Sequence, residues 1–354
     1  MTRFLVTGGA GFVGAHLALA AAEQVPNARV VAFDNLARRG SEFNLVRLDR
    51  AGVDFVHGDV RVRSDLERAG AFDVLLECSA EPSVLAGADG SPEYVIGTNL
   101  LGAVNCAEAC RHCRASMIFL SSSRVYPLQH LRACRLRETE TRYELDSSQE
   151  LPGVSERGIA ETFPMDGARS YYGASKYAAE VLLEEYRAAA CFPVVINRCG
   201  VLAGPWQFGK ADQGILTFWT AGHFFRQQRR YIGFGGNGRQ VRDILHIDDL
   251  SRLILQQIED PAAFAEGVYN VGGGHARSVS LQELTALCRE ATGVHTEIGR
   301  EPAGRYADIP VFITDNGRIS AQTGWQPRKT VRETVDDVTS WLRDVPAVHH
   351  LFTR

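Results

Sequence analysis

The sequence predicts an α/β protein in which a doubly wound parallel sheet is followed by a smaller C-terminal α/β lobe. Short apolar runs of strand length alternate with helical patterns through the first two thirds of the chain, and a glycine-rich turn joins the first run to the first helix. Strands and helices that alternate in this way need crossover connections, which make the strands parallel and cover both faces of the sheet. After about residue 200 the alternation loosens, which indicates the separate lobe.

The expected elements follow from these local patterns. Strands rich in Val, Ile, Leu and Phe are expected at Phe4–Thr7, Val30–Phe33, Val53–His57, Val74–Cys78, Met117–Leu120 and Pro193–Asn197. Helical patterns between them cover Val13–Glu23, Asn99–Cys113 and Tyr172–Ala189. A later helix is expected over Ser278–Thr292, with Ser278 as its N-cap and with Leu281, Leu284 and Leu287 along one face.

The composition excludes several classes of protein. The 354 residues are 45% hydrophobic and 23% charged with a formal net charge of −4, which is typical of a globular chain and excludes disordered, collagen-like and coiled-coil proteins. Basic residues form no patch of the kind that binds nucleic acid, so we expect no nucleic-acid partner. No run approaches the roughly 18 apolar residues of a membrane-spanning helix, and the N-terminus lacks the pattern of a signal peptide. We therefore expect a cytoplasmic protein without a membrane partner, whose eight cysteines remain thiols.

The segment Gly8–Gly14 has the composition of a phosphate-binding turn. Its glycines are spaced G-x-x-G-x-x-G between an expected strand and an expected helix. Glycines permit a tight turn and let backbone N–H groups and the helix N-terminus approach a pyrophosphate. Asp34 ends the next strand, where a carboxylate accepts hydrogen bonds from ribose hydroxyls and repels a 2′-phosphate, so we expect NAD rather than NADP, although Arg38–Arg39 lies near enough to receive a phosphate. Asp59 follows a later strand as either an adenine-side contact or an ordinary turn aspartate.

The phosphate-binding turn defines the expected domains. Residues 1–200 form a Rossmann-type NAD-binding domain, and 240–273 is expected to return to it. Residues 201–239 and 274–345 form the expected substrate-binding lobe, and 346–354 form a tail.

A tyrosine and a lysine four residues apart, Tyr172 and Lys176, share one face of an expected helix. An unperturbed phenol ionises only near pH 10 and is a poor base at neutral pH. A nearby ammonium group and the positive nicotinamide ring both favour the phenolate, which general base catalysis requires. The serines Ser121–Ser123 follow the strand that ends at Leu120, at the sheet edge where open α/β proteins bind ligands, and a hydroxyl there can bind the reacting substrate oxygen.

These residues make the chain resemble the extended short-chain dehydrogenase/reductase family, the nucleotide-sugar epimerases and dehydratases, over nearly its whole length. The resemblance implies a catalytic group of Ser122, Tyr172 and Lys176. The family pattern S/T-x-x-V-Y selects Ser122, and Ser123 remains an alternative. The related 4,6-dehydratases carry Asp-Glu directly after the catalytic Thr, whereas this chain has Ser123 and Arg124 there, which disfavours dehydration.

Within that family the chain resembles the CDP-paratose (CDP-tyvelose) 2-epimerase branch. The insert Glu138–Tyr143 and the run Gln240–Asp243 carry most of this resemblance. Two stretches depart from the family pattern: Glu77–Glu81 stands where His-x-Ala and Gln are usual, and Ala203–Gly204 where Tyr-Gly is usual. Both stretches line the nicotinamide or sugar pocket in the family, so the substrate can differ from that of the named enzymes.

The resemblance also assigns binding residues. Arg242 matches an arginine that holds the substrate diphosphate, and Arg305 resembles a second such contact, since a guanidinium fork suits phosphate oxygens. Further substrate contacts are expected at Ser123, Arg124 and Gln213. The expected cofactor contacts are Gly8, Gly11, Phe12, Val13, Gly14, Asp34, Asn35, Asp59, Val60, Asn99, Tyr172 and Lys176.

Three cysteines, Cys106, Cys110 and Cys113, have the C-x-x-x-C-x-x-C spacing that radical enzymes use for an iron–sulfur cluster. Cluster ligands need a loop that wraps the metal, whereas these residues lie in an expected helix, where the spacing places them on one face. We therefore expect a buried or interface face and no metal.

The sequence thus predicts an NAD-dependent nucleotide-sugar epimerase that oxidises its substrate, a nucleotide-diphosphate sugar, to a transient keto sugar, lets it rotate and reduces it again. A UDP-hexose 4-epimerase and a catalytically silent NAD-sensing protein of the same fold are the alternatives. The resemblance also implies a homodimer that pairs the helices Asn99–Cys113 and Tyr172–Ala189.

Overall fold

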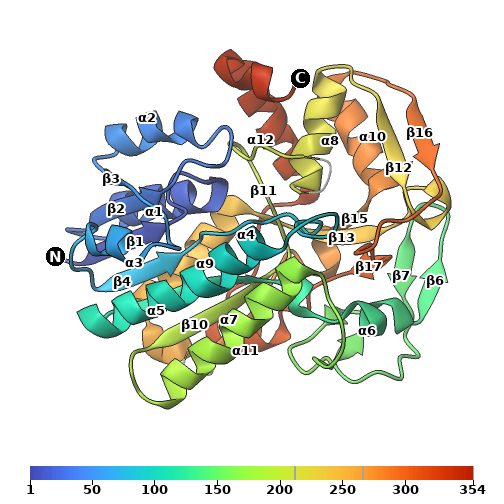
Figure 1. Cartoon of the computed structure of the whole chain (residues 1–354). Coiled ribbons are helices and arrows are strands. Elements are labelled where there is room, and N and C mark those ends of the chain that lie inside the picture. Colours follow the sequence, from blue (N-terminus) through green and yellow to red (C-terminus); the bar gives the residue numbers. More distant parts are fainter. Residues whose placement is uncertain (211–212, 265–266, 354) are drawn as a thin grey trace. The chain divides into compact units, whose positions relative to one another are not determined.

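The computed structural model describes residues 1–210, 213–264 and 267–353, which divide into two compact units (Figure 1). The first unit comprises Met1–Val125, Ser170–Arg198 and Leu250–Tyr269, and the rest of the chain forms the second unit. These units are not identical with the expected domains, because Tyr126–Arg169 groups with the second unit. In that segment Ile159 pairs with Thr314 of the second unit.

A seven-stranded sheet runs through the first unit in the order β14-β10-β5-β4-β1-β2-β3. The pairs from β3 to β5 are all parallel, and Phe4 lies beside Val30 on one side and Val74 on the other. This confirms the predicted fold class, and each expected strand is found to within two residues at either end. The strands are β1 (Arg3–Thr7), β2 (Arg29–Asp34), β3 (Asp54–His57), β4 (Val74–Glu77), β5 (Ser116–Ser122), β10 (Val194–Cys199) and β14 (Val268–Val271).

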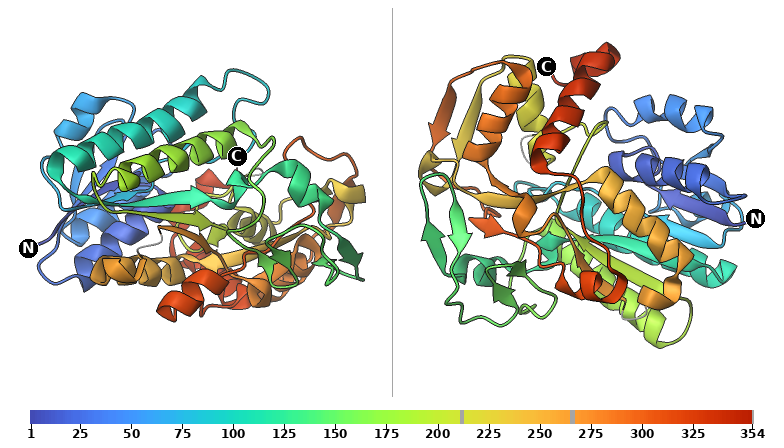
Figure 2. Two further views of the ribbon diagram at one scale, coloured as in Figure 1. Left: turned by 90° about the horizontal axis from the view of Figure 1, so that it is seen from below. Right: turned by 180° about the vertical axis from the view of Figure 1, so that it is seen from behind.

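Helices cover both faces of this sheet. Helices α5 and α7 lie side by side on one face, and α1 and α9 lie on the other (Figure 2). The predicted helix over Asn99–Cys113 starts with a π-helical turn, Gly97–Leu101, which leads directly into α5. The helices of this part of the chain are α1 (Phe12–Gln24), α2 (Glu42–Arg50), α3 (Arg63–Glu67), α4 (Glu93–Ile96), α5 (Gly102–Cys113), α7 (Tyr171–Ala188) and α9 (Ile247–Glu259).

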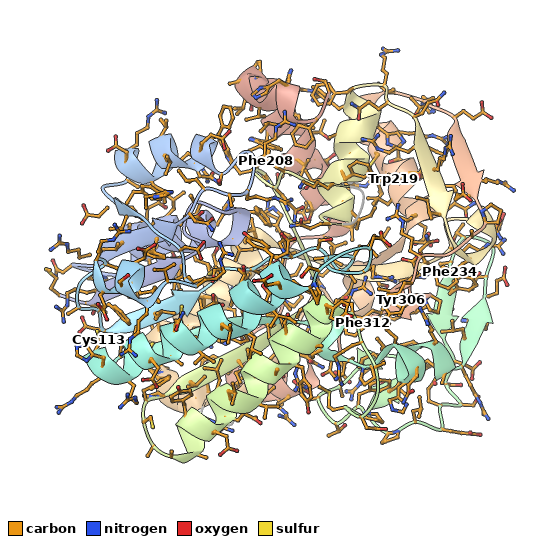
Figure 3. The ribbon with its side chains drawn as sticks, in the orientation of Figure 1. Cys113, Phe208, Trp219, Phe234, Tyr306 and Phe312 are labelled. Atoms are coloured by element: carbon orange, nitrogen blue, oxygen red, sulfur yellow. The ribbon has the colours of Figure 1, made fainter. Side chains whose placement is uncertain are left out.

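In its described residues, the second unit is built from small sheets, α-helices and short 3-10 turns. Trp219 of α8 donates a hydrogen bond to Thr285 of α10 (2.9 Å) and stacks on Tyr231 of β12, which joins three of its elements (Figure 3). Its strands are β6 (Leu136–Glu138), β7 (Tyr143–Leu145), β8 (Val154–Ser155), β9 (Gly158–Ile159), β11 (Val201–Ala203), β12 (Arg229–Ile232), β13 (Val241–His246), β15 (Ser278–Ser280), β16 (Ile298–Glu301) and β17 (Val311–Phe312). Its helices are α6 (Leu128–Ala133), α8 (Ile215–Phe224), α10 (Leu281–Thr292), α11 (Gly317–Thr323) and α12 (Val331–Asp344).

The predicted start of the helix over Ser278–Thr292 is wrong. Ser278–Ser280 is strand β15, which pairs antiparallel with β13, and Ser280 rather than Ser278 caps α10. Ser280 accepts a hydrogen bond from the N–H of Glu283, whose side chain bonds back to the Ser280 N–H, so the capping box fixes the boundary. No helix in the described ranges is both long and apolar enough to span a bilayer.

Candidate active site

The turn between β1 and α1 is packed so closely that it requires its glycines. Gly8 has a φ of +62°, and a Cβ added to Gly14 would lie 2.1 Å from the Gly8 carbonyl oxygen. Helix α1 starts after Gly11 with no side-chain cap and no acidic residue in its first turn. Its first N–H groups, those of Phe12 and Val13 among them, therefore suit an anionic ligand.

Asp34 is held beside this turn. The residue is 9% exposed, and its carboxylate accepts hydrogen bonds from the N–H groups of Ala10 (3.1 Å) and Leu36 (2.8 Å). Burial raises the pKa of the Asp34 carboxyl, and the N–H donors oppose that rise. Each oxygen retains lone pairs that can accept a ribose hydroxyl.

The Asp59 carboxylate is engaged by neighbours in its own loop. It accepts hydrogen bonds from Asn35 (3.0 Å) and from the Arg61 guanidinium (2.7 Å), and the Arg61 bond is the main cause that lowers the pKa of Asp59 to about 2. The Asp59 N–H donates to Asp65 (3.0 Å). These bonds order the turn after β3, whereas an adenine contact by Asp59, Asn35 or Val60 stays a prediction.

Asn99 connects the segment after β4 to α7. Its side-chain oxygen accepts the N–H of Glu81 (2.8 Å), and its amide group donates to the Glu81 carbonyl (3.1 Å) and to Ser175 (3.2 Å). Both amide hydrogens are therefore used within the first unit. The structure gives Asn99 a positioning role, and its contact with the cofactor stays a prediction.

Helix α7 fixes the predicted catalytic lysine against the sheet. Ser170 caps the helix, Tyr172 lies half-buried in its first turn, and Lys176 lies buried one turn later. The Lys176 ammonium donates to the carbonyl oxygens of Leu120 (3.0 Å) and Ser79 (3.4 Å). The Leu120 oxygen belongs to β5, two residues along the chain from Ser122, and the Ser79 oxygen lies two residues after the end of β4.

The three adjacent serines have different surroundings. Ser121 donates to Glu180, which forms a buried pair with Arg198 through N–O distances of 2.8, 3.0 and 3.2 Å. Ser122 accepts the N–H of Arg124 (3.1 Å) through its hydroxyl oxygen. Ser121 is therefore structural, and the assignment of Ser122 or Ser123 to the substrate stays a prediction. Nothing local in the sequence pointed to the pair of Glu180 and Arg198, because its members lie on different elements.

A second buried carboxylate lies beside the lysine. Glu77, the last residue of β4, is 0% exposed, and its Oε2 lies 3.6 Å from the Lys176 Nζ. Its other oxygen accepts the Ser79 hydroxyl. Burial raises the pKa of the Glu77 carboxyl, and the Lys176 ammonium opposes that rise. The sequence marked Glu77 as a departure from the family pattern but gave it no role.

The expected substrate residues of the C-terminal half belong to the second unit. Arg242 on β13 is half-buried and donates to two backbone carbonyl oxygens at 2.6 and 2.7 Å. The Arg305 N–H donates to the Asp308 carboxylate (2.9 Å). Gln213 directly follows a stretch outside the described ranges, and its backbone exchanges hydrogen bonds with Lys210 (2.7 and 3.1 Å). Phosphate contacts by these residues stay predictions.

The two stretches that carry the branch resemblance meet within the second unit. Arg239, directly before the run Gln240–Asp243, pairs with Glu138 and donates to the Glu140 carbonyl (3.2 Å). The Arg239 carbonyl accepts the N–H of Tyr143 (3.0 Å). The insert and the run are thus parts of one local structure.

The cysteines of α5 are packed as thiols. Cys106 and Cys110 are buried in the core of the first unit, and burial raises the pKa of both thiols, whereas metal ligation requires thiolates. Cys113 lies at the end of α5 (Figure 3). Across the described ranges, no group of three or more His, Cys, Asp or Glu residues is arranged to hold a metal ion.

Known proteins resemble this chain along nearly its whole length. The profile of the NAD dependent epimerase/dehydratase family matches residues 4–272. CDP-paratose 2-epimerase of Salmonella typhi is 29% identical over 97% of this chain and 100% of its own. The dTDP-glucose 4,6-dehydratase of Neisseria meningitidis is 26% identical over 96% of this chain and 95% of its own. The solved UDP-glucose 4-epimerase of Thermus thermophilus in complex with NAD has a TM-score of 0.77 at 24% identity and covers 96% of this chain and 99% of its own, which shows a shared fold.

Proposed function

Because the chain belongs to the NAD-dependent epimerase/dehydratase family, we propose that it is a nucleotide-sugar epimerase that works like CDP-paratose 2-epimerase. The observation that carries the proposal is the placement of Tyr172 and Lys176 on α7, with Lys176 bonded to the strand that ends in Ser122. The residues after Ser122 are Ser123 and Arg124 rather than an acid and a base, which favours epimerisation over dehydration.

The first unit has the residues that NAD needs. The glycine turn and the uncapped start of α1 suit the pyrophosphate, and the Asp34 carboxylate suits the adenosine ribose. The chemistry that NAD supplies is reversible hydride transfer, by which a sugar carbon becomes a ketone and is then reduced on its other face.

The chain's own residues move the proton and hold the sugar. The Tyr172 phenolate accepts the proton of the sugar hydroxyl and later returns it, and the Lys176 ammonium favours the phenolate. The Ser122 hydroxyl hydrogen-bonds the same substrate oxygen. Arg242 and Arg305 of the second unit bind the diphosphate, and Gln213 contributes a further substrate contact.

Product analysis tests the proposal. Purified protein is incubated with CDP- and UDP-sugars, and NMR of the product is expected to show inversion at C2 of a CDP-sugar. Inversion at C4 alone would identify the alternative, a UDP-hexose 4-epimerase. A 25% identical protein of Methanocaldococcus jannaschii that carries the name "Putative UDP-glucose 4-epimerase" supports this alternative. Protein that is inert towards every nucleotide sugar would favour the NAD-sensing alternative.

The Tyr172→Phe variant tests the assigned base. Loss of a general base typically costs about 100- to 10,000-fold in rate, so turnover is expected to fall by that factor. NAD binding is expected to persist, because the glycine turn is unchanged. Unaltered turnover of the variant would contradict the mechanism.

We also propose that the enzyme is a cytoplasmic homodimer. Exposed apolar side chains lie on the helix pair that the family resemblance assigns to the interface: Leu101 directly before α5, and Val181 and Leu182 on α7. Exposed apolar residues on neighbouring helices favour association. None of the eight cysteines forms a disulfide bond within the described part of the chain, which suits a reducing compartment.

A further inference from the structure

Strand β4 ends with a carboxylate in the core of the first unit. Glu77 is fully buried, and its Oε1 accepts the Ser79 hydroxyl. Its Oε2 has no hydrogen-bond partner among the described residues and faces the Lys176 Nζ across 3.6 Å. An ionised carboxylate at such a position is stable only where a cation balances it.

Lys176 is the cation that balances Glu77, because the elements packed around Glu77 present neutral or already paired groups. Helix α5 contributes the Cys106 thiol, whose pKa is raised by burial so that it stays neutral. On α7, the Glu180 carboxylate one turn after Lys176 is balanced by Arg198 at 2.8 Å. The strands on either side, β1 and β5, place uncharged residues opposite Glu77.

The lysine needs a counter-charge as much as the glutamate does. Lys176 is 2% exposed, and its hydrogen bonds go to the carbonyl oxygens of Leu120 and Ser79. Carbonyl groups bind an ammonium but leave its charge uncompensated in a medium from which water is excluded. The Glu77 carboxylate is close enough to compensate it.

We propose that Glu77 is the counter-ion of Lys176: its ionised carboxylate keeps the buried lysine protonated and sets the pH range in which Tyr172 and Lys176 act. Glu77 is a positioning residue, since it acts through the lysine and not on the substrate. The part of the proposal that concerns the reaction rests on the proposed epimerase function, whereas the charge pair can be measured without it.

Removing the charge has a defined sign. A nearby negative charge raises the proton affinity of every group around it, so its loss lowers that affinity. In Glu77→Gln, Lys176 is therefore expected to hold its proton less tightly. The limb of the pH–rate profile that depends on a charged Lys176 then moves to lower pH. A side chain that only fills space would leave that limb in place.

The small number of lysines makes the pair directly observable. The chain contains only Lys176, Lys210 and Lys329, so protein made with ¹³Cε-labelled lysine gives three signals, which Lys210→Arg and Lys329→Arg assign. In the NAD-loaded enzyme, Glu77→Gln and Glu77→His are expected to lower the titration midpoint of Lys176 by about one pH unit or more. Glu77→Asp keeps the charge and is expected to stay near the wild-type midpoint. If Lys176 of the wild-type protein stays protonated until the protein unfolds at alkaline pH, while Lys176 of the variants titrates at a lower pH, the midpoint has shifted in the expected direction.

The outcomes separate this proposal from the proposed function. A Lys176 midpoint that is unchanged in both charge-removing variants overturns the proposal, whatever the activity. Wild-type protein without epimerase activity overturns the proposed function and leaves the NMR result standing. If neither variant folds, ¹³C NMR of the glutamate carboxyl groups in the wild-type enzyme decides, with Glu77→Asp as the assignment: a protonated Glu77 at pH 7 overturns the proposal.

Discussion

Replacing Glu180 with glutamine removes one charge from the buried pair that joins α7 to β10. The Glu180 and Arg198 side chains are 2% and 9% exposed, and their N–O distances are 2.8, 3.0 and 3.2 Å. The same carboxylate accepts the Ser121 hydroxyl. The variant therefore removes the negative charge of Glu180 from this pair, and removing one partner of a buried ion pair is strongly destabilising.

The size of the loss follows from these contacts. A hydrogen bond to a charged group contributes about 1.5–3 kcal/mol. Glutamine keeps one acceptor oxygen, so about two such bonds are lost, which gives roughly 3–6 kcal/mol. That range agrees with the about 3–5 kcal/mol measured when one partner of a buried ion pair is removed. For a unit of this size, the melting temperature is expected to fall by roughly 6–24 °C.

Urea unfolding of Glu180→Gln followed by two probes measures this loss. All four tryptophans belong to the second unit, so their fluorescence reports that unit, whereas far-UV circular dichroism reports both units. The matched control is Asp54→Asn, which removes a carboxylate from an exposed pair with Arg29 at 3.2 Å, where a change within about 0.5 kcal/mol is expected. A loss below about 1 kcal/mol in the circular dichroism transition of Glu180→Gln would refute the reasoning.

Three further variants test other parts of the structure. Gly14→Ala places a Cβ 2.1 Å from a backbone oxygen and is expected to abolish NAD retention. The control is Gly90→Ala, whose added Cβ meets open space and which is expected to retain the cofactor. Equal NAD content in the two purified variants would disprove the role of the turn. The hydrogen bond from Arg61 is the main cause that lowers the pKa of Asp59 to about 2, against about 3.9 in an unfolded chain. The stability advantage of wild type over Asp59→Asn is therefore full above about pH 5 and shrinks as the pH falls towards 2. An advantage in urea unfolding that grows on acidification contradicts this. Val181→Glu puts a charge on the exposed apolar face of α7 and is expected to convert a dimer to monomer in sedimentation velocity, and an unchanged dimer would place the interface elsewhere.

The parallel sheet could be predicted because its strands are buried on both faces and therefore appear as continuous apolar runs. The same pattern located the glycine turn and Asp34 at the ends of neighbouring strands, where the structure joins them through the Ala10 N–H. The start of α10 was missed although the signal was present. Ser280 and Glu283 form the S-x-x-E pattern of a capping box, whereas the residue three positions after Ser278 is Leu281.

Contacts between distant segments could not be predicted in this way. The grouping of Tyr126–Arg169 with the second unit depends on backbone pairing such as that of Ile159 with Thr314, which no local pattern signals. The same limit applies to Arg242, whose residue type suits a phosphate but whose guanidinium donates to two backbone carbonyls of its own unit. Residue type alone could not separate these two uses.

Glu77 interrupts the apolar pattern of strand β4, and the fold supplies a chemical reason. A strand of a covered parallel sheet excludes charged residues, so a glutamate at the end of β4 violates the pattern that predicted the strand. It is tolerated because α7, a helix far along the chain, places the Lys176 ammonium opposite it. Two charges that would each destabilise the core alone become stable as a pair. The position at which the strand pattern fails therefore lies beside the residues to which we assign the chemistry, as expected where function and stability make different demands on one site.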